Sequence, residues 1–368
     1  MTEAARSTPG SEMMTLEKRI EQLLFGHGTV AVGFATTESL AGGPPSADLE
    51  YVLPGARSAV SFALAFDRDA IRAYLSKTDL QAQTSQQQAL YGTLGVLTEE
   101  VAVLLRESGH EAKAIIPNGE LRMDGSDGSS FSDAPQDPPL SHRYVAVASG
   151  VASFGWSGNV GIKGYGANIL LGTCVTKAEL TPTEPIPIDE GYCDDCKICV
   201  EACPSGMFER EKSMTQTLGG VTYTHSARRN YRRCLMVCSG LTGLPESGKW
   251  STWSAGRFSI PEDDERLKVE YMKAISVAKE RPHAPIVSGD NYRMHPDHPL
   301  NGIQIIPTCG NCQHVCFGDR RETAKNLKML RRSGCVVQQP DGSLEVLPPD
   351  DATRAFAALD PAHREKYE

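Results

Sequence analysis

Four cysteines in a tight, fixed spacing constrain this chain more than any other feature. Cys193, Cys196, Cys199 and Cys203, followed by Pro204, form a C-x2-C-x2-C-x3-C-P run. This spacing is typical of segments that wrap a 4Fe–4S cluster, with three thiolates on one cluster and the fourth on a second. A zinc site is the alternative, but zinc modules usually present two separated cysteine pairs. The run therefore predicts iron–sulfur binding.

A second, partial run adds more thiols. Its three cysteines follow a C-x2-C-x3-C order: Cys309, Cys312 and Cys316. The two runs together supply seven cysteines, one short of the eight that two clusters need. Cys234 and Cys238 are the candidates for the eighth. Cys174 and Cys335 have no motif around them, and we expect both to be ordinary buried thiols.

Composition limits the cellular location and the classes of function to be expected. The first twenty residues contain no apolar signal core, so we expect a cytoplasmic protein whose eleven cysteines are reduced. No apolar stretch approaches the ~18 residues that a membrane helix requires, and we expect no membrane association. The net charge of −9 weakens any function that depends on binding nucleic acid mainly through phosphate contacts.

The first half of the chain contains no cysteine before Cys174 and alternates between helical and strand patterns. Residues 1–13 are expected to be a flexible tail. Apolar spacing predicts a helix from Leu16 and another over 94–105, while short apolar runs predict strands at 29–35, 58–66 and 112–117. This alternation favours an α/β sandwich core.

Two further segments of this half have unusual compositions. Residues 118–141 form a long polar stretch, which is typical of a functional loop or of disorder. Residues 155–172 are rich in glycine, at 155, 158, 161, 164, 166 and 172. Glycine at this density allows either close approach of a flat ligand or tight turns. Spacing alone does not decide between them.

The two cysteine runs are separated by an insertion at 239–308. One amphipathic helix is predicted there, after Pro261. Trp250 and Trp253 could line a substrate pocket, although core packing is the commoner role. Three histidines follow the helix and are expected in surface loops: His283, His295 and His298.

Six sequence blocks together resemble a known superfamily. They are LPGARSAVSFALAF at 53–66, SDAP at 132–135, HRYVAVASGVASFGWSGN at 142–159, LGTCVT at 171–176, CDDCKICVEACPSGMF at 193–208 and CGNCQHVC at 309–316. The chain resembles the epoxyqueuosine reductases and reductive dehalogenases. This resemblance implies an α+β protein: a nitroreductase-like, cobalamin-binding α/β core at 14–185, a ferredoxin-like domain with two 4Fe–4S clusters at 186–335, and a C-terminal tail at 336–368.

The resemblance also implies how the thiolates are shared. Members of the superfamily have a lone cysteine between the two runs, and Cys234 matches its position better than Cys238. One cluster would use Cys193, Cys196, Cys199 and Cys316. The other would use Cys203, Cys234, Cys309 and Cys312.

Cobalamin and the proton donor are implied in the same way. The expected cobalamin contacts are Gly155, Trp156, Ser157, Gly158, Asn159, Gly166 and Gly172. Asp133 is the nearest match to the aspartate that donates a proton in epoxyqueuosine reductases. Tyr144 is its rival, because dehalogenases use a tyrosine.

Departures from the superfamily pattern indicate a divergent paralogue. The stretch between Cys234 and Cys309 is longer than in epoxyqueuosine reductases, and their GWIGKN-like block reads GWSGN. We therefore expect a cobalamin-dependent reductase that cleaves a carbon–heteroatom bond in a small organic substrate rather than in tRNA. Its electrons would come from a ferredoxin or flavodoxin. The alternatives are a cobalamin-free electron carrier with two clusters, or a reductive activator of a partner enzyme.

Overall fold

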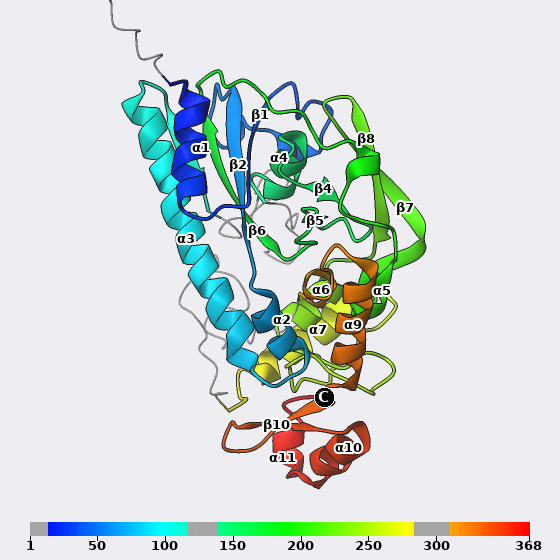
Figure 1. Cartoon of the computed structure of the whole chain (residues 1–368). Coiled ribbons are helices and arrows are strands. Elements are labelled where there is room, and N and C mark those ends of the chain that lie inside the picture. The colour runs from blue at the N-terminus through cyan, green and yellow to red at the C-terminus, as the bar shows by residue number, and fades with distance from the viewer. Residues whose placement is uncertain (1–13, 117–121, 123–137, 283–309) are drawn as a thin grey trace, which may run out of the picture.

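A four-stranded antiparallel sheet forms the centre of the first half of the chain, in the order β1-β2-β6-β3 (Figure 1). The computed structural model describes residues 14–116, 122, 138–282 and 310–368. The strands are β1 (Ala31–Thr36), β2 (Ser58–Ala65), β3 (Ala112–Ile115) and β6 (Ile169–Thr176).

Helices cover both faces of this sheet. On one face lie α1 (Leu16–Gly26) and α3 (Leu80–Glu107), and on the other lies α4 (His142–Ala148) (Figure 1). The side chains of β2 alternate accordingly: Phe62 packs in the core shared with α1 and α3, whereas Ala63 packs in the core shared with α4. The expected helices and strands of this half are confirmed, and together they make the mixed helix-and-sheet core.

The second half adds short helices and one long hairpin. Its elements include α5 (Ile198–Ala202), β7 (Phe208–Leu218), β8 (Val221–Arg228), α6 (Arg232–Cys238), α7 (Asp264–Ala278), α8 (Asn311–His314) and α9 (Arg320–Arg332). Smaller elements are α2 (Arg68–Leu75), β4 (Ser153–Phe154), β5 (Val160–Gly161) and 3-10 turns at Pro45–Ala47 and Ile188–Glu190. Helix α7 is the helix predicted after Pro261. No helix in the described ranges is both long and apolar enough to span a membrane.

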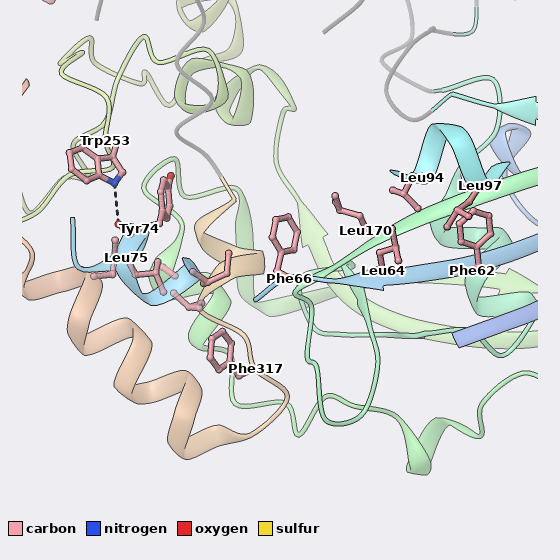
Figure 2. Packing of buried hydrophobic residues seen from close by; sticks show 14 of the residues in the cluster. Phe62, Leu64, Phe66, Tyr74, Leu75, Leu94, Leu97, Leu170, Trp253 and Phe317 are labelled. Carbon is pink, nitrogen blue, oxygen red and sulfur yellow. Dashed lines mark hydrogen bonds between the residues drawn. The ribbon is translucent and has the colours of Figure 1, made fainter. Parts of the chain in front are cut away.

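One hydrophobic core joins the two halves. Phe66 and Tyr74 come from the first half, and Phe317 follows the second cysteine run, yet all three are buried in the same cluster (Figure 2). Trp253 belongs to this cluster too, and its indole Nε1 donates a hydrogen bond of 3.1 Å to the Tyr74 carbonyl. Its role is therefore core packing. The cluster contains residues from both sides of residue 186, where the domain boundary is predicted.

The C-terminal residues correct one expectation. Residues 336–368 are predicted as a tail, but they form regular structure. Strand β9 (Cys335–Gln338) begins one residue earlier and is followed by β10 (Leu344–Leu347), α10 (Pro349–Ala358) and α11 (Pro361–Arg364). Phe356 and Tyr367 are buried in the main core, and the Tyr367 hydroxyl donates to the Gln338 side chain over 2.9 Å. Helix α10 packs against both strands of the β9–β10 hairpin.

Candidate iron–sulfur site

Five cysteines from the two runs line a single cavity: Cys193, Cys196, Cys199, Cys312 and Cys316. The runs are distant in sequence, but α5 packs against α8 and brings them together. Among the described residues, no three His, Cys, Asp or Glu side chains are placed to hold one metal ion. Thiolates spread around a cavity suit a larger metal–sulfur group, since a 4Fe–4S cube takes one thiolate at each iron.

The electrostatics show which thiols are neighbours. Burial raises the pKa of Cys316, and the charges of Cys193 and Asp194 raise it further. Burial likewise raises the pKa of Cys312 to about 11, with a further contribution from Cys203. Buried thiols that raise one another's pKa are poor thiolates by themselves and become stable as anions when a metal binds them. Burial raises the pKa of Cys199 as well, with a further contribution from Cys312, which belongs to the other implied cluster. The division of the thiols between two clusters therefore stays a prediction, and Cys309 lies outside the described residues.

The loop between Cys193 and Cys199 is shaped by unusual backbone angles. Asp195 and Lys197 have φ values of 54° and 58°, and only one other described residue besides glycine has a positive φ. Left-handed backbone at such residues costs free energy and is typical of functional sites. The Cys196 amide donates to the Asp194 carboxylate over 3.2 Å, which tightens the same turn.

The G-W-S-G-N segment contacts the cysteines directly. The Trp156 amide donates to Cys193 Sγ over 3.4 Å, and the Asn159 side-chain amide donates to Cys312 Sγ over 3.4 Å. The Ser157 carbonyl accepts hydrogen bonds from the Arg228 guanidinium, the shorter being 2.8 Å. Hydrogen bonds to cluster sulfurs help to set reduction potential. Trp156 and Asn159, two of the residues expected to contact cobalamin, therefore donate hydrogen bonds to cysteine sulfurs instead.

Most of the glycines expected at cobalamin face protein atoms. A Cβ atom would lie 2.2 Å from the Tyr192 hydroxyl at Gly155, from the Cys316 carbonyl at Gly166, and from the Phe62 ring at Gly172. At Gly158, whose φ is +69°, it would lie 2.9 Å from the Arg228 guanidinium. Internal packing thus explains these glycines, and they give no sign of a cradle for cobalamin.

The turn at Cys203 lies next to helix α6. Cys203 Sγ accepts a hydrogen bond from the Met207 amide over 3.4 Å. Helix α6 packs on this turn, because the Arg233 guanidinium donates to the Ser205 carbonyl over 2.9 Å. Cys234 and Cys238 both lie on α6 with their sulfurs 3.6 Å apart. The preference for Cys234 therefore stays a prediction.

The two candidate proton donors are treated differently by the structure. Asp133 lies outside the described residues, as do the three loop histidines His283, His295 and His298. Tyr144 lies on α4, and the centre of its ring is 6.2 Å from the centre of the Phe154 ring. The Arg143 guanidinium lies 5.9 Å from the centre of the Tyr144 ring. Neither role is decided by this placement.

Sequence reasoning missed two residues that hold the site together. The Asn168 side-chain amide donates to the Cys316 carbonyl over 2.8 Å and to the Gln313 carbonyl over 3.1 Å. Tyr192 is buried among the cysteines, and this burial raises its pKa well above the ordinary value. No motif marks either residue. Cys174 and Cys335 are buried, as expected.

Comparison with known proteins first defines the class. Residues 186–209 match the 4Fe–4S binding domain family, so the predicted iron–sulfur segment is confirmed. The chain is also similar to an epoxyqueuosine reductase of Bacillus cereus, with 26% identity over 166 residues. That similarity covers 43% of this chain and 37% of the other protein, so the chain matches well under half the length of this relative. The expected resemblance to this superfamily is confirmed.

Solved structures of the same two groups are similar as well. A reductive dehalogenase, reported with a mechanism for B12-dependent dehalogenation, has a TM-score of 0.45 at 13% identity, covering 72% of this chain and 35% of its own. An epoxyqueuosine reductase with a tRNA-Tyr stem loop has a TM-score of 0.40 at 17% identity, covering 86% and 80%. With scores below 0.5, these folds are only loosely alike.

Proposed function

We propose that this protein is an iron–sulfur reductase whose two 4Fe–4S clusters pass electrons to a ligand of the α/β core. One observation carries the proposal: the 155–159 segment donates hydrogen bonds to Cys193 and to Cys312. These cysteines belong to different implied clusters. The segment leads through β5 into β6 of the sheet, so the core and both cluster sites share one connected element.

The cluster half would accept single electrons from a low-potential ferredoxin or flavodoxin in the cytoplasm. Cluster potential depends on hydrogen bonds to sulfur and on burial. The chain provides both, through the Trp156 and Asn159 donors and through burial that raises the pKa of Cys196 and Cys312 to about 11. The core, which we take to be a nitroreductase-like sandwich, would orient the substrate and exclude water.

Cobalamin dependence is the second candidate, and the similarity to an epoxyqueuosine reductase favours it. When bound, cobalamin would supply low-valent cobalt chemistry that side chains cannot perform. The glycines at 155, 166 and 172 do not support a cradle for it, because protein atoms occupy the space beside each one. The cobalamin-free alternatives to a reductase are an electron carrier and an activator of a partner enzyme.

A proton must accompany reductive cleavage of a carbon–heteroatom bond. Asp133 is the first candidate donor and Tyr144 the second, with a small organic substrate favoured over tRNA. Asp133→Asn should leave iron content unchanged and lower turnover by about 10²–10⁴, the usual contribution of a positioned acid. If Asp133→Asn turns over normally and Tyr144→Phe does not, the role belongs to Tyr144. Normal turnover in both variants would exclude both.

The proposal is tested by anaerobic preparation with added cobalamin, followed by iron, cobalt and zinc analysis and by mixing with reduced ferredoxin. Cluster absorbance that bleaches on mixing shows that ferredoxin reduces the clusters, as the reductase and both alternatives require. Cobalt that co-purifies at about one per chain supports the second candidate, whereas iron without cobalt supports the cobalamin-free carrier or activator. Zinc in place of iron would refute all of them.

A further inference from the structure

A second cavity lies beside the Cys203 turn. Its volume is about 920 Å³, within the usual range for small-molecule sites. Cys203 and Gly206 form one part of its lining, and Thr242, Trp250 and Arg257 of the insertion form another. The insertion that distinguishes this chain from epoxyqueuosine reductases therefore builds a wall of this cavity.

Most of the cations that line the cavity are balanced by carboxylates. Arg229 and Arg233 both pair with Glu262, and Arg331 pairs with Glu201 over 3.0 Å. Lys249, also in the lining, is exposed to solvent. These groups need no ligand to satisfy them.

Arg257 is the exception. Within the part of the chain that the structure describes, its guanidinium has no hydrogen-bond partner, and its Nε and Nη2 atoms are buried. Burial lowers the pKa of Arg257, and only the charges of Cys335 and Glu368 raise it. A buried charge without a partner is costly, and an unsatisfied group of this kind in a folded protein calls for an explanation such as a missing ion. The third nitrogen, Nη1, is not buried, so an anion in the cavity would reach the guanidinium there.

The surroundings hold Arg257 in place for that task. Its backbone amide donates to the Tyr367 carbonyl over 2.8 Å, and its guanidinium lies 4.4 Å from the centre of the Phe356 ring. The Phe356 ring covers one face of the planar group, and Nη1 is the nitrogen left accessible to a ligand. A guanidinium N–H is a strong donor to carboxylate or phosphate oxygens. Trp250, buried in the same lining, offers an apolar surface to the rest of a ligand.

We propose that this cavity binds a small organic anion, a carboxylate or a phosphate ester, whose charged group pairs with Arg257. The body of the ligand lies along Trp250, in a cavity whose lining also includes Cys203. That the ligand lies beside a cluster rests on the proposed function. That the cavity binds an anion does not.

The test is calorimetric titration of the cluster-loaded protein with two probes, inorganic phosphate and succinate. We expect saturable binding of at least one probe, and the stronger probe indicates whether phosphate or carboxylate is preferred. Arg257→Met should weaken that binding about tenfold or more, as expected for loss of a charge-assisted hydrogen bond. Arg354→Met is the matched control, because Arg354 is exposed on α10 and pairs with Asp351. Its affinity should equal that of the wild type.

Two results would overturn the proposal: neither probe binds the wild type, or Arg257→Met binds as tightly as the wild type. Should thermal melting show that Arg257→Met is unfolded, Arg257→Lys replaces it. Lysine keeps the charge but lacks the planar fork, so affinity should still fall. Unchanged affinity in Arg257→Lys would then overturn the proposal. Iron content, measured on every sample, separates a failure of anion binding from a failure of cluster loading.

Discussion

Replacing Gly166 with alanine should disrupt the cluster site through backbone contact. Gly166 lies after β5 at a φ of +67°, and the Ala167 amide donates to the Cys316 carbonyl over 3.1 Å. A Cβ at Gly166 would lie 2.2 Å from that carbonyl and 2.4 Å from the Gly318 amide. Both neighbours are backbone atoms, so they cannot move aside as a flexible side chain would.

Gly164 offers a matched control for the size of this effect. Its φ is +88°, but a Cβ there would meet no atom within 4 Å. Both substitutions incur the left-handed backbone cost of about 1–2 kcal/mol. Only Gly166→Ala adds the cost of overpacking, about 1–3 kcal/mol or more. The free energy of unfolding should therefore fall by about 2–5 kcal/mol for Gly166→Ala and by about 1–2 kcal/mol for Gly164→Ala.

Chemical denaturation and iron analysis of the two variants measure this difference. Gly166→Ala should lose cluster iron as well as stability, because displacement of its neighbours moves Cys316. Gly164→Ala should keep its iron. If Gly166→Ala retained full iron and were as stable as Gly164→Ala, the close packing described between these two loops would be wrong.

Three further changes have defined outcomes. Asn159→Leu removes a hydrogen bond to Cys312 Sγ, so the potential of that cluster should become more negative in a redox titration; an unchanged potential would contradict the contact. Burial lowers the pKa of His142 from 6.5 to about 4. The unfolded chain therefore binds this proton more readily, and the free energy of unfolding should fall as pH drops from 6.5 to about 4. In His142→Gln, the free energy of unfolding measured by denaturation at each pH should fall less steeply across that range. An equal slope in the variant and the wild type would refute the assignment. Cys234→Ser should reduce iron content whereas Cys238→Ser should not, and the reverse would exchange their roles.

The sequence predicted the elements whose signals are local. The apolar spacing after Pro261 predicts the face of α7 that carries Leu267 and Tyr271, and both are buried. Cysteine spacing predicted the iron–sulfur segment because cluster binding depends on short loops. Such patterns need no knowledge of distant neighbours.

Other features depend on contacts that no local pattern contains. The β7–β8 hairpin turns at Gly219 and Gly220. Its strands are mostly polar, so they lack the apolar alternation that predicts a strand. Gly172 is required by the Phe62 ring on the neighbouring strand, a contact that neither the glycine spacing nor the resemblance contains. The unpaired state of Arg257 appears only once the fold brings Phe356 and the cavity together.

The central claim, two 4Fe–4S clusters held by eight cysteines and contacted by the α/β core, is tested most directly by counting iron and acid-labile sulfide. Protein prepared without oxygen should contain about eight irons and about eight sulfides per chain. The Cys203→Ser variant should contain less iron and less sulfide than the wild type. About four irons per chain would leave one cluster and contradict the second site. One zinc and no iron would contradict the account entirely.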